Sequence, residues 1–476
     1  MNAALACAAY STSTPLNITA PGSWTGSVNT DWSIPGNWSC NMVPTSTSDV
    51  TINSGAPAYP VLTADFAIHN ISIAAGASVK VDGGKIAVGG KIISTGVFDV
   101  IGGTVEFNGT QAQAIPANVF KNNTIKNLII SNDVDLEGQD TLTGTLSFGK
   151  SSVSFNTLNN LTLKSTAIGT ARVADITNNN TLNGNTITGN VSVERYIPAR
   201  KAWRLLSTPI LANSTQTINQ AWQEGVNVST NNPTPNYGTH ITGGTAANGY
   251  DQGTTNNASI KVLNAAGTTF VGLNTNPGTN IPISTFGGYF VYIRGDRSFN
   301  MAAPTTAPST NTTLRMKGGL RTNDQLVTVR AKNNTVMGNP YPSAIDFHTL
   351  LKNNVKDLFY IWDPKLSGSN GLGAYVTLSW NRNTNDYDAT ASASPVGRYI
   401  PSGEAVLVEA IDTTMAGSIR VRETDKTSNG NDHVFGFTNG LQQKVRVNLF
   451  AVNTDNSRSL LDGILTTYDE DYLNTI

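Results

Sequence analysis

Short apolar runs that end at glycine, asparagine or aspartate recur between residues 60 and 195, and they restrict the fold more than any other feature. Examples are FAIHNISI, ASVKVDGG, GVFDVIGG, TVEFNGT, IKNLIIS and TLTGTLSF. Each run alternates apolar and polar residues, which is typical of a strand followed by a turn. One such strand cannot bury its apolar face alone, whereas stacked coils of roughly 20 residues share a continuous core. We predict a β-solenoid, or β-helix-like stack, over residues 58–195, with a meandering β-sandwich as the alternative.

The composition extends this prediction to the whole chain. The 476 residues include 44 glycines and 20 prolines, and only 13% are charged. This composition disfavours long solvent-exposed helices and favours short strands joined by turns, so we expect an all-β protein. The formal net charge of -1 provides no basic field for nucleic acid. No run of about 20 apolar residues predicts a membrane-spanning helix.

Residues 1–57 form a tryptophan-rich segment that precedes the repeats. Trp24, Trp32 and Trp38 lie in a loop-rich stretch before the first clear strand. A repeat stack needs an atypical end, so these rings could plug the open end of the core. Exposed rings could instead stack on sugars, which makes the three tryptophans candidate glycan-stacking residues. Both interpretations stay open at this point.

Cys7 and Cys40 are the two cysteines of the chain. In an exported protein they could form a disulfide that closes a loop of roughly 30 residues and stabilises the fold by about 3 kcal/mol. The opening MNAALACAAYSTST contains small residues like those around signal-peptide cleavage sites, but it lacks a cationic start. A processed N-terminus would remove Cys7, so the disulfide and an unpaired Cys40 both remain open.

The chain changes character at VERYIPARKAWRLLSTPI, which spans residues 193–210. Longer strands with larger aromatic residues and wider loops follow this seam. Its arginines could bridge two β units by pairing with backbone carbonyls and carboxylates, or they could bind an acidic ligand. We predict that Arg195, Trp203 and Arg204 lie at a domain interface.

Beyond the seam we expect a jelly-roll-like β-sandwich over residues 196–430. The stretch AWQEGV predicts a brief helical turn, and LFYIWD predicts a strand. Ser343 or Asp346 could cap a short helix over residues 347–354. Residues 431–476 are expected to begin a further β-sandwich domain.

Several motifs, in order along the chain, resemble those of large secreted surface proteins from gliding and biofilm-forming Gram-negative bacteria that use the type IX secretion system. The likeness covers most of the chain. The motifs are the spaced tryptophans before a D-V-x-I strand, GGTVEFNGTQAQAI, RYIPA-x-x-AWRLLS-x-P, FGGYFVYIRGD, GNPYPSAIDF, YIWDP and the P-S-G-E turn at residues 401–404.

This resemblance implies export across the outer membrane by the type IX secretion machinery, followed by retention at the cell surface or release. It implies adhesion or a structural stalk, with surface glycans or other cells as partners. Proteins of such bacteria are often O-glycosylated at D-[ST]-[ALIVMT], so Thr141 and Thr413 become candidate sites. The family's C-terminal sorting domain is not visible in LDGILTTYDEDYLNTI.

The sequence shows no group of residues that is typical of a catalytic site. No G-x-S-x-G nucleophile motif occurs, the four histidines are scattered, and most carboxylates occupy turns. In NRNTNDYDAT, Asp386 and Asp388 offer oxygen ligands of the kind that calcium takes, although ordinary turn chemistry also explains them. We predict a non-catalytic structural or adhesive protein. The alternative is a carbohydrate-binding module or a polysaccharide-degrading enzyme with a β-helix domain.

Overall fold

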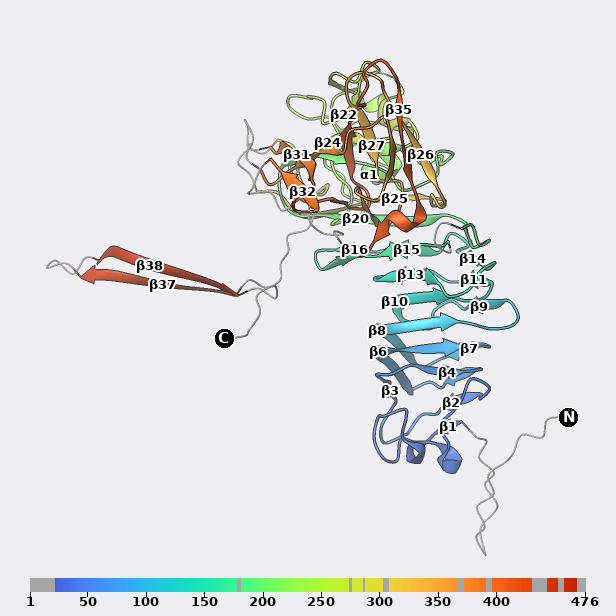
Figure 1. The fold of residues 1–476 in the computed structure, drawn as a ribbon. Helices are drawn as coiled ribbons and strands as arrows, with labels where there is room; N and C mark the ends of the chain where they lie inside the picture. Colours follow the sequence, from blue (N-terminus) through green and yellow to red (C-terminus); the bar gives the residue numbers. More distant parts are fainter. Residues whose placement is uncertain are drawn as a thin grey trace, which may run out of the picture.

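The computed structural model describes residues 22–177, 181–273, 276–285, 287–302, 308–366, 372–390, 396–429, 443–452 and 458–468. Within these ranges the chain is nearly all β, and α1 (Ile218–Trp222) is the one α-helix. A slender solenoid stalk carries a broader head at its C-terminal end (Figure 1). The predicted all-β class and the N-terminal solenoid are confirmed. The helical turn expected in AWQEGV lies earlier, because α1 covers INQAW and includes only Ala221 and Trp222 of that stretch.

The stalk is a stack of parallel strands in which each coil repeats the previous one. The long strands β6 (Ser78–Val88), β8 (Val97–Phe107) and β10 (Phe120–Ile130) pair side by side in one large sheet. Val79 lies opposite Phe98, and Val134 lies opposite Phe155, so successive coils are offset by roughly 20 residues.

Short strands form a second face of the stalk. They make two four-stranded parallel sheets. The first contains β1 (Ser23–Trp24), β2 (Val50–Ile52), β5 (Ile71–Ile73) and β7 (Ile92–Ser94), and the second contains β9 (Gln113–Ile115), β11 (Val134–Leu136), β14 (Ser154–Asn156) and β19 (Thr186–Thr188). The remaining strands of the large sheet are β3 (Val61–Leu62), β4 (Phe66–Ile68), β12 (Asp140–Leu142), β13 (Thr145–Phe148), β15 (Leu161–Leu163), β18 (Arg172–Val173), β20 (Val191–Ile197) and β25 (Thr312–Gly318).

The regular pairing of the long strands is interrupted where the chain turns a corner of the coil, and glycines occupy this corner. Between β6 and β8 the register shifts around Asp82, and Gly83 adopts a positive φ of 91°. A Cβ atom on the next residue, Gly84, would lie 2.2 Å from the carbonyl oxygen of Ala64 in the preceding coil. Adjacent coils can therefore approach at this corner only because Gly84 has no side chain.

Three tryptophans close the N-terminal end of the stack. Trp24, Trp32 and Trp38 are only 3%, 0% and 2% exposed, and Trp38 packs edge-on against both other rings. The indole nitrogen of Trp38 donates a hydrogen bond of 2.8 Å to the carbonyl oxygen of Trp32. The structure thus supports the plug. The prediction of a glycan-stacking platform is wrong, because the apolar end of the first coil covers the ring faces that a sugar would need.

The stalk and the head share one sheet. β20 pairs in parallel with β15 of the stalk and antiparallel with β25 of the head. The antiparallel register runs from Val191 opposite Gly318 to Ile197 opposite Thr312. Figure 1 shows these two strands at the boundary between stalk and head. The large sheet, with eleven strands, therefore continues from the stalk into the head without a linker.

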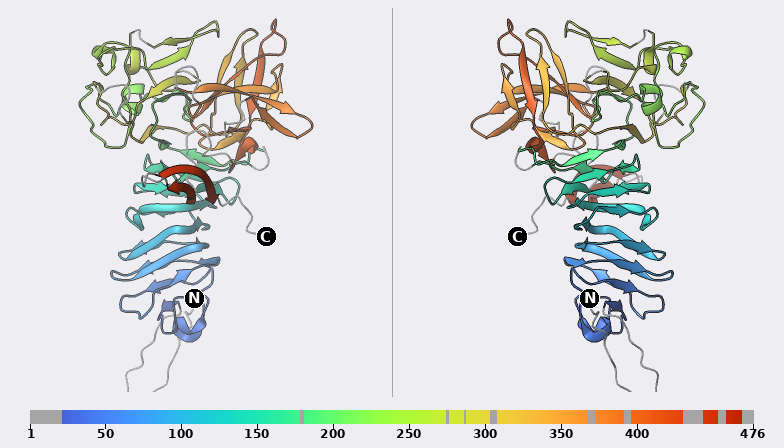
Figure 2. Two further views of the ribbon diagram at one scale, coloured as in Figure 1. Left: turned by 90° about the vertical axis from the view of Figure 1, so that its left-hand side faces the viewer. Right: turned by 90° about the vertical axis from the view of Figure 1, so that its right-hand side faces the viewer.

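The head consists of two lobes, which lie side by side above the stalk (Figure 2). In the first lobe, β21 (Ala202–Leu206), β24 (Tyr289–Ile293), β22 (Ile260–Leu263) and β23 (Phe270–Gly272) form an antiparallel sheet. Buried residues of this lobe, including Trp222 and Tyr289, belong to the same hydrophobic core as the stalk. The second lobe has a separate core, so the predicted domain over residues 196–430 contains two packing units.

The second lobe is built from three small antiparallel sheets. The largest contains β27 (Thr335–Gly338), β34 (Ala405–Val408), β30 (Leu358–Asp363), β31 (Ala374–Asn381) and β32 (Asp386–Ala389). A second contains β26 (Gln325–Val329), β35 (Gly417–Val421) and β29 (Leu351–Asn353). The third contains β33 (Tyr399–Ile400), β28 (Ala344–Asp346) and β36 (Lys426–Thr427). The predicted strand LFYIWD is β30. Farther along the chain, β37 (Gln443–Val452) and β38 (Arg458–Tyr468) pair as an antiparallel hairpin.

The predicted helix over residues 347–354 is wrong. Asp346 accepts a hydrogen bond from the backbone N–H of His348, as a cap would, but the chain then makes only a turn. Leu351 to Asn353 become β29 because β35 offers them an antiparallel partner. Asn354 then adopts a positive φ of 51°, which ends the strand. Tertiary pairing thus overrides the local capping signal.

A buried ion pair fastens the second lobe to the stalk. The Nζ atom of Lys426 lies 2.6 Å from the Glu423 carboxylate, and both side chains are buried. Glu423 also accepts the backbone N–H of Ile176 in the stalk at 3.2 Å and that of Asn323 in the head at 2.8 Å. Lys426 in turn donates to the carbonyl oxygen of Ala174. The charges of Lys426 and Glu423 are therefore compensated by each other and by backbone groups of the stalk and the head.

Replacing Gly84 by alanine should destabilise the stalk by about 1–3 kcal/mol, because the added methyl group collides with backbone that cannot yield. Gly169→Ala is the matched control, since a Cβ atom there has no neighbour within 4 Å. Urea unfolding followed by tryptophan fluorescence measures both variants. Equal unfolding midpoints for the two would contradict the close approach at the corner.

Lys426→Met should destabilise the protein by about 3–5 kcal/mol, because it leaves the Glu423 carboxylate buried without its cation. The double variant Lys426→Met, Glu423→Gln should recover part of this loss. Arg420→Met, which removes an exposed partner of Asp324, should change stability by less than about 1 kcal/mol. Thermal unfolding of this set, together with Glu423→Gln alone, measures the coupling between the two residues. Strictly additive effects of the two junction substitutions would refute it.

Candidate functional site

The arginines of the seam stabilise the junction mainly through hydrogen bonds to backbone carbonyl oxygens. Arg204 is buried, and its guanidinium lies 3.3 to 3.4 Å from the carbonyl oxygens of Arg200, Ala202 and Pro198. Burial lowers its pKa to about 9. The Arg200 guanidinium donates to the carbonyl oxygen of Lys365 in the second lobe at 3.1 Å. This cluster thus links the seam to the second lobe of the head.

Arg195 and Trp203 also lie at contacts between units. The Arg195 guanidinium donates to the hydroxyl of Thr170 in the stalk at 3.2 Å. Burial raises the pKa of the Glu404 carboxyl in the second lobe well above its ordinary value, and the charge of Arg195 opposes that effect. Trp203 stacks on Phe290 within the first lobe, with ring centroids 4.8 Å apart, and both rings pack in an apolar cluster with Ala405 and Leu407 of the second lobe. The three predicted interface residues are therefore at the junction of the stalk and the two lobes.

The structure gives no support to the predicted calcium site. The Asp386 carboxylate faces Arg398 at 3.9 Å, and the Asp388 carboxylate accepts a hydrogen bond of 2.6 Å from Asn381. Throughout the described ranges, no group of three or more histidine, cysteine, aspartate or glutamate residues could hold a metal ion. The two aspartates thus have protein partners that account for them.

The remaining predicted residues lie apart from one another. Cys40 forms a disulfide, whereas Cys7 lies outside the described residues. Thr141 is half-buried in β12 between two neighbouring strands. Thr413 is exposed in the turn after β34, so a glycosyltransferase could reach it on the folded protein. O-glycosylation of either threonine stays a prediction.

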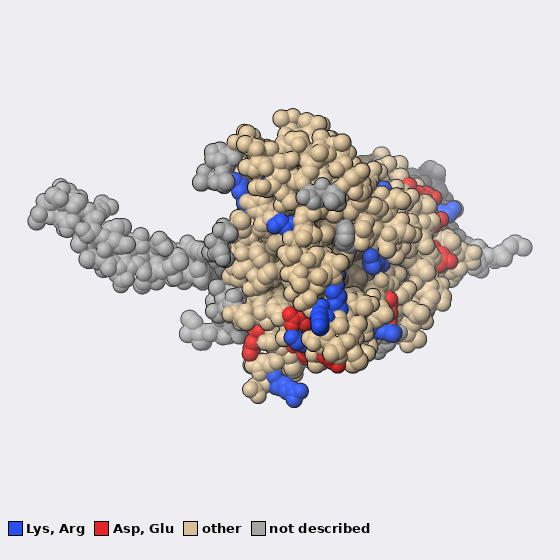
Figure 3. All heavy atoms as spheres, turned by 90° about the horizontal axis from the view of Figure 1, so that it is seen from above, with Lys and Arg blue, Asp and Glu red and all other residues tan. Residues whose placement is uncertain are grey.

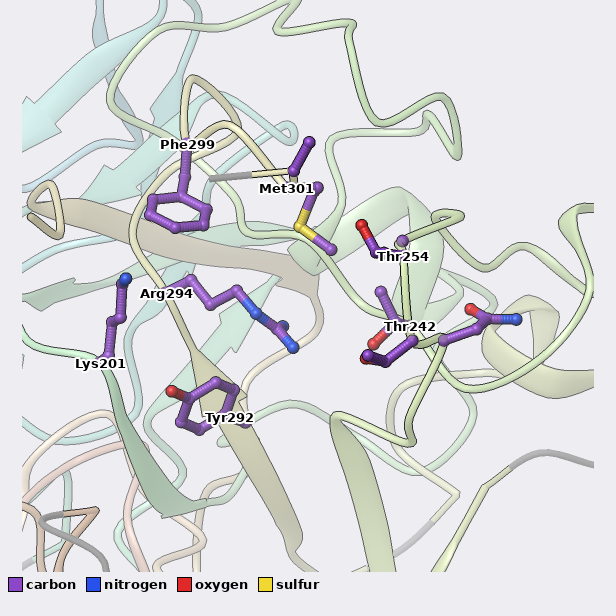
Figure 4. Close-up of a pocket in the computed structure, with 11 residues that line it drawn as sticks. Lys201, Thr242, Thr254, Tyr292, Arg294, Phe299 and Met301 are labelled. Carbon is purple, nitrogen blue, oxygen red and sulfur yellow. The ribbon is translucent and has the colours of Figure 1, made fainter. Parts of the chain in front are cut away.

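The first lobe of the head contains a pocket of about 350 Å³, which we call the head pocket. Its volume falls within the range of about 300–1,000 Å³ that is usual for small-molecule sites. Cationic, aromatic, hydroxyl and amide side chains come together in it (Figure 4). The lining residues that bear on its chemistry are Lys201, Thr242, Thr254, Asn256, Tyr292, Arg294, Phe299 and Met301.

Two cations line the head pocket. Residues 201 and 294 lie beside each other because β21 pairs antiparallel with β24, with Ala202 opposite Ile293. The Arg294 guanidinium lies 4.7 Å from the centre of the Tyr292 ring, and the Lys201 ammonium lies 4.6 Å from that of Phe299. Burial lowers the pKa of both groups, and their mutual repulsion lowers that of Lys201 further. Among the described residues that line this pocket, none is an aspartate or a glutamate.

A buried polar network lies next to the residues that line the pocket and holds their backbone in place. Arg297 forms a two-pronged ion pair with Asp251, with distances of 2.7 and 2.9 Å. Both side chains are fully buried, and Gln223 and the backbone N–H of Ile241 also donate to the same carboxylate. The Nε2–H group of His240 donates a hydrogen bond of 3.1 Å to the carbonyl oxygen of Phe299. The loops that carry Thr242 and Phe299 are therefore fixed by hydrogen bonds to this network.

A second, more open hollow of about 770 Å³ lies on the stalk. Its lining residues come from several successive coils and include His69, Lys91, Gln111 and Asp135. Asp135 is the one carboxylate among them, whereas most glycoside hydrolases use two that flank the scissile bond. This surface therefore does not assemble the pair of groups that such an enzyme needs.

The sequence indicated only part of the head pocket. Lys201 stood out within the cationic seam, and FGGYFVYIRGD was recognised as a strand, but Arg294 was not assigned a role. An arginine that directly follows five residues of a buried strand was the available signal. What the sequence could not supply was the register of β21 against β24, which brings Arg294 beside Lys201.

Asp140 is an unusual residue inside the stalk. Its side chain points inward from β12 and is buried, and neither carboxylate oxygen has a hydrogen-bond partner among the described residues. Burial alone raises its pKa to about 7. A neutral carboxyl is tolerated in such a place far better than a carboxylate.

Because the pKa of Asp140 is higher in the folded state than its ordinary value of 3.8, the folded protein binds the proton more tightly. Stability should therefore fall between about pH 4 and pH 7 and then level off. Asp140→Asn should remove this component and stabilise the protein at pH 8 by at most about 4 kcal/mol. Asp135→Asn, at an exposed position, is the control. Urea unfolding at pH 5 and pH 8 measures the free energy of unfolding of each variant. The same pH response in both variants would argue against a buried proton on Asp140.

Comparison with known proteins identifies only part of the chain. Residues 23–105, which comprise the tryptophan-rich segment from Ser23 onward and the first coils of the stalk, match the family model described as Domain of unknown function (DUF8693). No curated protein and no solved structure matches the chain. None of the helices in the described ranges has the length and apolar character that a membrane span requires.

Proposed function

We propose that this chain is an exported cell-surface protein with a structural and adhesive role, of the kind that the type IX secretion system transports. Its stalk holds the head at a fixed distance and angle from the surface to which the protein is attached. The observation that carries this proposal is the pairing of β20 with both β15 and β25, which makes stalk and head one continuous sheet.

The mechanical part of the proposal rests on the junction. A hinge would need a segment with few contacts, whereas the described junction combines strand pairing, the buried Lys426–Glu423 pair and the carbonyl contacts of Arg204. Force applied to the head would therefore pass into the stalk through backbone hydrogen bonds.

The adhesive part of the proposal rests on the surface of the head. Seen from above, this surface is mostly uncharged, and the few basic and acidic residues on it lie partly next to one another (Figure 3). Such a surface has little general electrostatic attraction for other molecules, so selective contact would come from defined pockets. The head pocket is the site that we assign to this contact, and its aromatic walls also favour the related function of a carbohydrate-binding module.

Export has a direct test in the bacterium that produces this protein. Protease added to intact cells should degrade the protein, because it lies outside the outer membrane. Deleting the type IX secretion pore should leave the protein inside and protected. Immunoblotting of the head, with a periplasmic protein as the control for lysis, reads out both strains. Protection in wild-type cells would overturn the assignment to the cell surface.

A further inference from the structure

We propose that the head pocket binds an acidic saccharide through a carboxylate on the sugar, such as a uronate unit of a surface polysaccharide. This inference rests on the proposed adhesive function and names the class of ligand for it. The pocket offers positive charge for the carboxylate, aromatic walls for the sugar ring, and hydroxyl and amide groups for the sugar hydroxyls.

The positive charge in the pocket favours an anionic ligand. The Asp251 carboxylate acts electrostatically on Arg294, but Arg297 already engages both of its oxygens. Arg294 lines the pocket, and it makes no ion pair or side-chain hydrogen bond within the described part of the chain. Guanidinium groups bind carboxylates with two parallel hydrogen bonds, so an incoming carboxylate would supply the acceptors that Arg294 lacks.

The lining favours a sugar over a bare inorganic anion. Figure 4 shows Arg294 extending across the pocket, with Tyr292 on one side of it and Phe299 and Met301 on the other. Aromatic and thioether groups add apolar surface that a phosphate ion could not use, and about 350 Å³ is far more than one small ion fills. Thr254 and Asn256 extend the lining with groups that can hydrogen-bond to hydroxyls.

The site is also rigid enough for selective binding. The Arg297–Asp251 pair and the hydrogen bond between His240 and the Phe299 carbonyl fix the segments on two sides of the pocket. Strand pairing of β21 with β24 fixes the backbone beside Lys201 and Arg294. Little ordering would therefore be needed when a ligand enters, which preserves affinity.

Calorimetric titration of the whole chain tests the charge requirement. The probes are oligogalacturonate, the same oligomer with its carboxyl groups methyl-esterified, and inorganic phosphate. The acid should bind, the ester should bind at least about tenfold more weakly, and phosphate should not displace the acid. Raising the salt concentration should weaken binding of the acid. Equal binding of acid and ester, displacement by phosphate, or no binding of the acid would overturn the inference.

Substitutions of residues that line the head pocket test whether oligogalacturonate binds there. Arg294→Gln and Lys201→Gln should each weaken binding of oligogalacturonate by about tenfold or more, and Arg294→Lys should retain part of it. Lys317→Gln removes the same charge from an exposed position in β25, outside the pocket, and should leave binding unchanged. Unchanged thermal unfolding of each variant shows that the fold is intact. Equal losses for Lys317→Gln and Arg294→Gln would place the binding elsewhere.

Beads coated with the protein separate this inference from the proposed function. Wild-type beads should adhere to a uronate-rich biofilm matrix, and Arg294→Gln beads should adhere much less. If both adhere equally, the head pocket is not the contact and this inference fails while adhesion stands. If wild-type protein binds oligogalacturonate in solution but its beads do not adhere, the adhesive function fails while the pocket assignment stands.

Discussion

A stack of parallel β coils has two open ends, and closing them is the constraint on which the rest of this molecule depends. Each end exposes apolar side chains and a row of unpaired backbone groups. Tryptophans fill the N-terminal end, where Trp32 is fully buried. At the other end, β20 gives its free edge to β25 from the head. The head is therefore both the cap of the stalk and the part that the stalk presents.

This dual role explains why most of the buried apolar side chains of the first lobe belong to the same core as those of the stalk. These side chains, from Leu206 to Leu320, continue the hydrophobic interior that begins at Trp24. The second lobe packs around its own core. A small apolar cluster of Leu205, Phe290, Ala405 and Leu407 joins it to the first lobe, and polar contacts of Glu423, Lys426 and Arg200 add to the attachment. The head pocket lies in the lobe that is continuous with the stalk, so a ligand bound there would pull on the sheet itself.

The stalk was predictable from the sequence because its signal is local and repeated: each coil shows the same alternation and ends in the same turn residues. Features that depend on contacts between distant segments were not predictable. The helix expected after Asp346 was replaced by β29, because β35 supplies a partner more than 60 residues away. The tryptophans allowed two interpretations until their burial was known. Arg294 had no recognisable role until the register of β24 placed it beside Lys201.

A distance distribution between stalk and head tests the central claim that they form one rigid body. Spin labels at residues 93 and 326, which are both exposed and lie in the stalk and the second lobe respectively, allow pulsed dipolar spectroscopy without disturbing either core. The shared sheet and the buried junction predict a single narrow distribution. A broad distribution, or one with two separated maxima, would show a hinge between stalk and head and would contradict the account.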